Sequence, residues 1–205
     1  MVRKTKEDAE VTRQQIIDAA REVFFARGVS RTPMETIAEK AGVTRGAIYW
    51  HFRNKTDLFQ AMREQVFLPR IDRMDGILLV EGEDDPLSCI ERFFCSTIQV
   101  LNDDLKTRRT YEVMMTRCEY VDEFAEVLRL ILSNCSGFVE KIELVYRRAQ
   151  DKGLLRPGDD PAALAMDSHF FFTGLLHMWV KDAENGSIRK HAMQSIKAHI
   201  ALRRK

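Results

Sequence analysis

Apolar residues recur along the chain with the three-to-four-residue spacing of amphipathic helices. One stripe precedes the helix-ending residue Gly28 and consists of Ile16, Ala20, Val23 and Phe24. Another follows the cap-and-proline pair Asp85-Pro86 and consists of Leu87, Ile90, Phe94, Ile98 and Leu101. Further helices are predicted at about 104–118, 122–151, 161–181 and 187–203. With only ten glycines and five prolines in 205 residues, the pattern predicts an all-α fold.

Residues 32–55 carry the signals of two short helices that cross at a sharp turn. Thr32 and Glu35 have the spacing of a capping box, and Pro33 suits the first helical position, where its missing N–H costs nothing. Gly42 can supply the positive φ that a chain needs to leave a helix near Ala41. A helix is therefore predicted from Pro33 to about Ala41.

The second short helix is predicted to begin after Thr44, which can cap it. Ile48 and Phe52 stand four residues apart and face inward together. The side chains left on the outer face and at the N-terminal end are Arg45, Gly46, Ala47, Tyr49, Trp50 and His51. A helix this short has little stability of its own, which favours a role in display.

That display suits the major groove of DNA. Arg45 can pair with a guanine edge, Tyr49 and His51 can reach phosphates or bases, and small residues allow close approach. Lys55 follows Asn54, a predicted cap, so a lysine and free helix amides could together clamp a phosphate. The predicted DNA-binding residues are Thr32, Thr44, Arg45, Gly46, Ala47, Tyr49, Trp50, His51 and Lys55.

The string Tyr49-Trp50-His51-Phe52, followed by Asn54-Lys55 and preceded by Thr36-Ile37-Ala38 and Ala41-Gly42-Val43-Thr44-Arg45-Gly46, resembles the DNA-binding head of the TetR family of bacterial repressors. The resemblance covers roughly residues 10–70. The opening residues 2–7, with Arg108-Arg109 and Cys118-Glu119, are similar to the AcrR-like subgroup that controls multidrug efflux pumps. A helical hairpin with a purely structural role would not need this full set of caps and exposed polar residues.

Charge is concentrated where the motif lies. Residues 1–63 hold twelve Lys and Arg against eight Asp and Glu, whereas the whole chain has a net charge of only +1. This modest local excess fits a docking face for phosphates better than a nonspecific basic coat. The longest apolar run, residues 170–180, is too short to span a bilayer, so no membrane partner is expected.

Cysteine usage predicts reduced thiols in a cytoplasmic protein. There is no Cys-x-x-Cys pair and no secretion signal, and the four cysteines are widely spaced: Cys89, Cys95, Cys118 and Cys135. Cys118 lies between Arg117 and Glu119, which leaves a redox or metal role open, but a small buried residue is the favoured interpretation. We expect no metal and no cofactor.

The predicted organisation has three parts: a basic arm at 1–9, a helix-turn-helix head at 10–70 with the motif at about 33–52, and a helical ligand-binding and dimerisation domain at 71–205. The helix that starts at Asn54 should kink or end at Pro69, because proline removes the hydrogen bond to Gln65. A polar loop is expected from Gly76 to Asp85.

The segment 161–181 is apolar almost all round, so it should be buried on two sides. One side would pack on its own domain and the other, with the last helix, on a second copy. The resemblance implies a homodimer built through a four-helix bundle, which would present two recognition helices to successive major grooves. The predicted dimer residues are Phe171, Leu175, Met178, Trp179, Ile196 and Ile200.

Polar groups are scattered among aromatic and methionine residues in the later helices, as in a roomy apolar ligand cavity. The predicted pocket residues are Val66, Phe67, Phe93, Phe94, Thr97, Tyr111, Glu112, Met115, Phe138, Ile142, His169, Phe172, Thr173, Leu176 and His177. Any one of them could equally be an ordinary core residue. The resemblance implies that a small apolar or aromatic inducer binds there and releases operator DNA.

Two other functions remain open on the sequence. Glu112 with His169 or His177 could form a general acid/base pair in a helical-bundle enzyme. No nucleophile motif, metal-ligand spacing or phosphate-binding glycine loop accompanies them, so an enzyme is not expected. A ligand-independent regulator or an activator is also compatible with the sequence.

Overall fold

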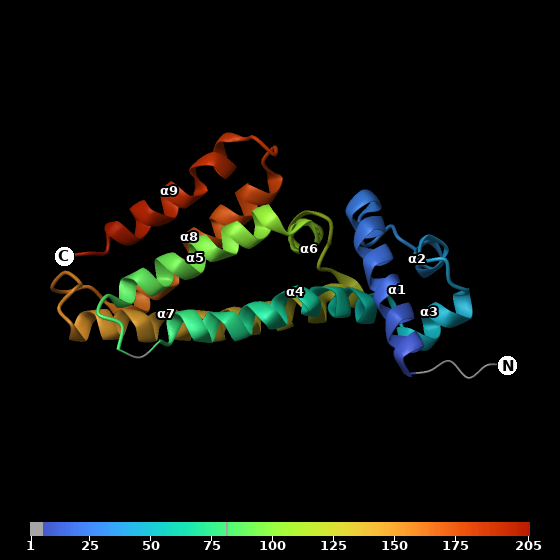
Figure 1. The fold of residues 1–205 in the computed structure, drawn as a ribbon, viewed down its shortest axis with the longest axis horizontal. Coiled ribbons are helices and arrows are strands. Elements are labelled where there is room, and N and C mark those ends of the chain that lie inside the picture. Colours follow the sequence, from blue (N-terminus) through green and yellow to red (C-terminus); the bar gives the residue numbers. More distant parts are fainter. Residues whose placement is uncertain (1–5, 81) are drawn as a thin grey trace. The chain divides into compact units, whose positions relative to one another are not determined.

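The structure is a computed structural model that describes residues 6–80 and 82–205 of the chain. Within these residues the elements follow in the order α1 (Lys6–Arg27), α2 (Met34–Lys40), α3 (Arg45–His51), α4 (Lys55–Leu78), α5 (Pro86–Asp103), α6 (Leu105–Thr116), the 3₁₀ helix η1 (Asp122–Phe124), α7 (Ala125–Asp151), α8 (Pro161–Lys181) and α9 (Ser187–Ala201) (Figure 1). In the described part of the chain, β geometry is limited to an isolated bridge between Leu155 and Arg204. The all-α prediction is confirmed.

The chain divides into two compact units. The first contains the residues up to Leu68 together with Arg109–Leu128, and the second contains Pro69–Arg108 and Arg129–Lys205. The division at Leu68 lies close to the end predicted for the head. The sequence did not indicate that the segment 109–128 would pack with the head, because that segment joins it through long-range contacts.

Helix α4 runs through Pro69 and ends at Leu78. The predicted alternative in which the helix ends at Pro69 is therefore wrong, and so is a loop that begins at Gly76. Proline removes a single helical hydrogen bond. Met74 and Leu78, which follow it, are 6% and 1% exposed, and this burial stabilises the turns beyond the proline.

The first unit packs around the apolar stripe of α1. Ile16, Ala20 and Phe24 are fully buried, and Gly28 ends the helix with φ of 83°, as predicted. The backbone N–H of Val29 donates to the carbonyl oxygen of Arg117 at 2.8 Å, which ties the loop after α1 to the segment after α6. Helix α1 already begins at Lys6, so the arm predicted at 1–9 is wrong for residues 6–9, which are helical, while residues 1–5 lie outside the described residues.

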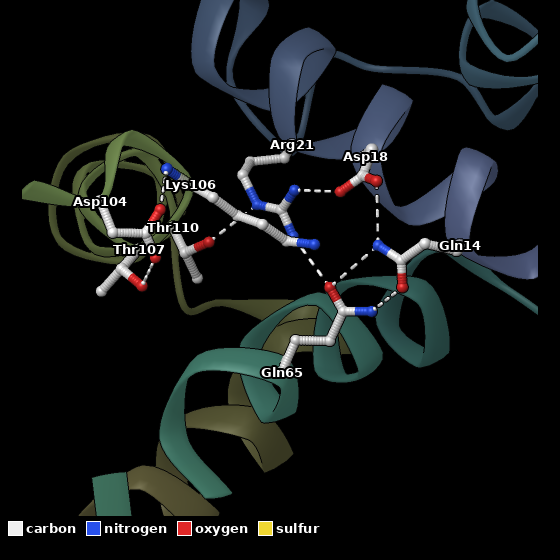
Figure 2. A network of polar contacts seen from close by, with 8 residues as sticks. All are labelled: Gln14, Asp18, Arg21, Gln65, Asp104, Lys106, Thr107 and Thr110. Atoms are coloured by element: carbon white, nitrogen blue, oxygen red, sulfur yellow. Dashed lines mark hydrogen bonds and ion pairs between the residues drawn. The ribbon is translucent and has the colours of Figure 1, made fainter. Parts of the chain in front are cut away.

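A buried arginine joins three helices of the first unit (Figure 2). The Arg21 side chain of α1 donates to Asp18 at 2.5 Å, to Gln65 of α4 at 3.1 Å and to Thr110 of α6 at 2.9 Å. Gln65 in turn donates to the side-chain oxygen of Gln14 at 2.6 Å. Because Arg21 is only 4% exposed, these charge-assisted hydrogen bonds are little weakened by water and fix α4 against α1.

In the second unit, α9 packs against both α5 and α8. All five residues of the predicted α5 stripe are fully buried. A polar chain crosses this core: the Tyr146 hydroxyl is 2.7 Å from the Ser168 hydroxyl, which is 3.1 Å from Nε2 of His199. The predicted later helices are confirmed as α6, η1 with α7, α8 and α9.

Candidate DNA-binding site and ligand-binding residues

The turn between α2 and α3 has the predicted construction. Gly42 has φ of 68°, and the backbone N–H of Val43 donates to the carbonyl oxygen of Ala38 at 3.0 Å. The Thr44 hydroxyl accepts a hydrogen bond from the backbone N–H of Ala47 at 3.2 Å, as a cap for α3. These local contacts set the crossing of the two short helices.

The predicted capping box at the start of α2 is wrong. The Thr32 hydroxyl donates to the carbonyl oxygen of Gly28 at 2.7 Å and makes no cap, and α2 begins at Met34 with Pro33 as its cap residue. Thr32 is 1% exposed, so its predicted contact with DNA is also corrected: the side chain belongs to the core of the unit. A threonine that can satisfy a buried carbonyl of the preceding turn gains more there than at an exposed cap.

Helix α3 presents the predicted outer face. Ile48 is fully buried and Phe52 is 2% exposed, whereas Tyr49 and Trp50 are 41% and 72% exposed. The Trp50 ring meets the ring of His51 edge-on, with centroids 4.5 Å apart. A tryptophan this exposed leaves an apolar surface on α3 that a binding partner could cover.

Arg45 stands at the start of α3 with 75% of its side chain exposed. Its Nε lies 3.1 Å from a carboxylate oxygen of Glu35, and its guanidinium lies 5.8 Å from the centre of the Tyr49 ring. An exposed pair of this kind contributes little stability, so a guanine edge or a phosphate can replace Glu35 at small cost. Sequence reasoning missed this pair because it assigned Glu35 to the cap.

Asn54 caps the start of α4 as predicted, and Asp57 adds a second hydrogen bond there. The Asn54 side chain accepts from the backbone N–H of Asp57 at 2.8 Å, and Asp57 accepts from the backbone N–H of Arg53 at 3.2 Å, which completes a reciprocal cap. The Lys55 ammonium is turned inward instead of standing free: it donates to the carbonyl oxygen of Ser30 at 3.0 Å and lies 3.7 Å from Glu123. Its phosphate-binding role stays a prediction.

Part of the predicted ligand pocket is an aromatic cluster in the second unit. Phe94 and Phe172 stack with ring centroids 4.0 Å apart, and Phe138 lies 5.6 Å from Phe93 and 5.7 Å from His169. Burial lowers the pKa of His169, and its Nδ1 has no hydrogen-bond partner among the described residues. A ligand that entered between these rings would have to separate the contacts of Phe94 with Phe172 and of Phe138 with its neighbours.

Other predicted pocket residues of this unit have different surroundings. Thr97 is 7% exposed and donates to the carbonyl oxygen of Phe93 in its own helix, while Ile142 and Leu176 are core residues. His177 is half-buried. Thr173 is exposed on α8, so its placement among buried pocket residues is corrected.

The remaining predicted pocket residues belong to the first unit. Phe67 and Tyr111 stack with centroids 5.2 Å apart, and Val66 is 7% exposed. Glu112 and Met115 are half-buried on α6. The carboxylate of Glu112 therefore lies in a different unit from the two histidines with which it was paired as an acid/base candidate.

A cavity that the sequence did not indicate lies in the second unit, where α4 ends. It has a volume of about 220 Å³ and is lined by Leu78, Val80, Gly82, Glu83, Pro86, Cys89, Arg148 and Lys152. Two of its cations already have partners: Arg148 donates to the carbonyl oxygen of Val80 at 3.4 Å, and Lys152 lies 3.8 Å from Asp84. None of these residues was among the predicted pocket residues.

The predicted dimer face requires a correction. Trp179, Ile196 and Ile200 are fully buried inside the second unit, so they cannot meet a second copy. Phe171 is half-buried and stacks on His199 with centroids 4.0 Å apart, and Leu175 is half-buried too. The apolar face that α8 does expose consists of Met166, Phe170 and Met178, at 43%, 66% and 50%.

The four cysteines are free thiols. Burial and, to a smaller extent, the neighbouring Glu119 raise the pKa of Cys118 to about 12. The group is therefore a neutral thiol at pH 7, which favours the predicted small buried residue over a reactive sensor.

Among the described residues, no helix is both long enough and apolar enough to cross a bilayer.

Comparison with known families and proteins places both parts of the chain. Residues 16–62 match the family model described as bacterial regulatory proteins, tetR family. Residues 85–204 match the model described as the C-terminal region of MAATS-type transcriptional repressors. The two matches together cover most of the sequence.

Curated relatives match over nearly the full length. The chain is 39% identical to the HTH-type transcriptional regulator TtgR of Pseudomonas putida over 181 residues, which are 88% of this chain and 85% of that protein. It is 31% identical to the HTH-type transcriptional regulator AcrR of Shigella flexneri over 192 residues, which are 94% of this chain and 89% of that protein.

Solved structures show the same fold. NalD, described as the secondary repressor of the MexAB-OprM multidrug efflux pump in Pseudomonas aeruginosa, superposes with a TM-score of 0.85 at 33% identity, covering 97% of this chain and 98% of its own. The complex of SmeT with triclosan has a TM-score of 0.82 at 30% identity, covering 95% and 92%. SmeT is described as the repressor of the SmeDEF multidrug efflux pump of Stenotrophomonas maltophilia.

Proposed function

Since the chain belongs to the TetR family of bacterial transcriptional regulators, we propose that it represses efflux-pump genes by binding a palindromic operator as a homodimer. A hydrophobic or aromatic compound, bound by the helices that follow the head, releases the operator. A repressor of this kind works in the cytoplasm, where its operator lies. No enzymatic step is part of this proposal.

The exposed face of α3 is the observation that carries the proposal. Arg45, Tyr49 and Trp50 project from a seven-residue helix whose opposite side is fixed by Ile48 and Phe52. A recognition helix inserted in the major groove reads bases with such side chains, while neighbouring cations contact phosphates. His51, Gly46, Ala47 and Thr44 complete the proposed contact surface.

Dimerisation is proposed through the exposed apolar face of α8. Met166, Phe170 and Met178 follow one another at helical spacing on that face. An apolar stripe on a helix that is otherwise packed in a core is costly to leave in water, and a two-fold related copy can cover it. Two copies related in this way would read the two halves of a palindrome.

Control of efflux genes and release by a ligand are proposed from the relatives. NalD and SmeT are described as repressors of multidrug efflux pumps, and one solved structure is a complex of SmeT with triclosan. Phe138, a half-buried aromatic residue of the second unit, offers apolar surface to a flat compound of that type. A ligand that favours the DNA-incompetent arrangement must weaken operator binding.

DNA binding is tested by selecting duplexes from a randomised pool and measuring affinity by fluorescence anisotropy. A palindromic consensus is expected. Arg45→Ala should weaken the consensus by about 1–3 kcal/mol and relax the preference at one base position. Arg147→Ala, which removes an exposed arginine of the second unit, should leave both unchanged. Equal losses on consensus and random DNA for Arg45→Ala would remove its base-reading role.

The role of Lys55 has its own readout. If its ammonium leaves the Ser30 carbonyl for a phosphate, Lys55→Ala should weaken all sequences alike and reduce the slope of log affinity against log salt by about one. An unchanged slope would assign Lys55 to the structure of the unit alone.

Release is tested by isothermal titration of triclosan with and without the selected operator duplex. Triclosan should bind the free protein more tightly than the complex, and the operator affinity should fall by the same factor in triclosan. Operator binding that triclosan and other aromatic compounds leave unchanged would make the protein a ligand-independent regulator.

A further inference from the structure

A second buried arginine of the first unit is not paired as Arg21 is. Arg63 lies on α4 and is 4% exposed. Its Nε and Nη1 are buried, and neither has a hydrogen-bond partner among the described residues. Buried donors of a charged group are costly when they lack acceptors, and a chain rarely keeps them without a use.

An aromatic ring lies against this guanidinium, and further ring pairs involve the neighbouring turns of α4. It lies 5.8 Å from the centre of the Phe67 ring, which is stacked on Tyr111. One turn earlier on α4, Phe59 meets Tyr120 edge-on, with centroids 6.4 Å apart. All of these residues belong to the first unit. Ring faces stabilise a cation, but they accept no hydrogen bond of normal strength from it.

Glu64 and Tyr120 act electrostatically on Arg63, but neither accepts a hydrogen bond from its Nε or Nη1. The Tyr120 hydroxyl donates to the carbonyl oxygen of Met114 at 2.9 Å, and burial raises the pKa of Tyr120, so the phenol is uncharged at pH 7. The carboxylate of Glu64 accepts from Gln60 at 3.3 Å. Burial lowers the pKa of Arg63, whereas Glu64 and Tyr120 act in the opposite direction. Two nitrogen donors of the Arg63 cation, Nε and Nη1, therefore lack an acceptor that an anion could supply.

We propose that Arg63 anchors an aromatic anion, with a carboxylate or phenolate on the guanidinium and the flat ring against Phe67. The proposal rests on the proposed ligand-released repressor and specifies the chemical class of its ligand, whose anionic group would be held in the first unit, where the predicted pocket residues Val66, Phe67 and Tyr111 lie. A carboxylate would satisfy the two orphaned nitrogens with charge-assisted hydrogen bonds. A water molecule could accept a hydrogen bond there but would leave the charge uncompensated.

The position of Arg63 connects such a ligand to the DNA-binding motif. Arg63 and Lys55 lie eight residues apart on the same helix, which corresponds to about 12 Å along the axis. Helix α4 begins directly after the recognition helix α3, and its first turn is capped by Asn54. An anion that changes the packing around Arg63 therefore acts on the helix that holds α3.

The experiment compares two probes of nearly equal shape, 2-naphthoate and the neutral 2-naphthamide, by isothermal titration. Wild-type protein should bind the acid at least about tenfold more tightly than the amide, as expected for hydrogen bonds to a charged group. Arg63→Met should lose about tenfold or more for the acid and keep its affinity for the amide. Arg63→Lys, which keeps the charge, should retain the preference for the acid.

Thermal unfolding supplies an independent readout. Because Met replaces a desolvated, unpaired cation by an apolar side chain, Arg63→Met should melt at the wild-type temperature or above it. Arg147→Met is the control, since it removes an exposed arginine and should change neither the melting temperature nor either affinity. A lower melting temperature for Arg63→Met would make Arg63 a structural residue and overturn the proposal.

The outcomes separate this proposal from the one on which it rests. Equal affinities for acid and amide, unchanged in Arg63→Met, would overturn the anionic site and leave a ligand-released repressor in place. Binding of triclosan that Arg63→Met leaves unchanged, without binding of 2-naphthoate, would do the same. If triclosan and both naphthyl probes all leave operator affinity unchanged, the proposed release by a ligand fails as well.

Discussion

Replacing Arg21 by methionine should destabilise the first unit by about 2–4 kcal/mol. Removing one member of a buried ion pair costs about 3–5 kcal/mol, but the partner Asp18 is 45% exposed and can regain water, which lowers this contribution to about 1 kcal/mol. The lost hydrogen bonds to Gln65 and Thr110 add about 0.5–1.5 kcal/mol each. Methionine keeps the apolar packing of the side chain, so the change isolates the guanidinium.

Urea unfolding followed by circular dichroism measures the loss, and amide hydrogen exchange of α1 locates it in the first unit. Arg27→Met is the matched control, because Arg27 is exposed at the last turn of the same helix. It should lose less than about 1 kcal/mol, the value of a cation at a helix C-terminus. The stability lost in Arg21→Met should be the same in high salt, since a buried ion pair is little screened.

Equal losses for the two variants would refute this reasoning. They would mean that Asp18, Gln65 and Thr110 find other partners at no cost, so that the network of Figure 2 does not hold α1, α4 and α6 together. A loss that disappears in high salt would likewise place the pair in water.

Three further expectations concern the second unit and its junction. Burial lowers the pKa of His199 to about 4, so between pH 6.5 and 4 the unfolded chain takes up the proton first. Stability is therefore lost as the pH falls through this window, by up to about 3 kcal/mol. In urea titrations, His199→Gln should lose less stability than the wild type over the same pH range. Equal pH dependence of the unfolding free energy in the two proteins would contradict the assignment to His199. Phe170→Asp should yield monomers in sedimentation experiments, whereas Leu132→Asp should not, although Leu132 on α7 is 58% exposed against 66% for Phe170; a monomeric wild type would contradict the proposed dimer. Pro69→Ala restores a helical amide and should change the coupling between triclosan and operator more than either separate affinity, and titrations with unchanged coupling would exclude Pro69 as the joint.

Local contacts explain why the sequence determined so much of the DNA-binding site. The turn at Gly42 and the caps at Thr44 and Asn54 each depend on groups within a few residues of one another. The inward placement of Ile48 and Phe52 follows from helical periodicity alone. Such features can be predicted from spacing because the interacting groups are close in the chain.

Competition between distant groups decided the rest. Thr32 and Glu35 fit a capping box by spacing, yet the carbonyl of Gly28 and the guanidinium of Arg45 bind them instead. The apolar residues of α8 predict two buried sides, but only packing against α5 and α9 determines that Trp179 faces the core.

At the candidate ligand site, the surroundings of Arg63 likewise could not be predicted from the sequence. Its spacing from Phe59 and Phe67 on α4 could have signalled an arginine on a buried face. The surroundings of its donors depend on Tyr120, which acts on Arg63, and on Tyr111, which stacks on Phe67; the segment 109–128 brings both from far along the chain. Periodicity determines which side of a helix a residue occupies, and only the tertiary structure determines what it meets there.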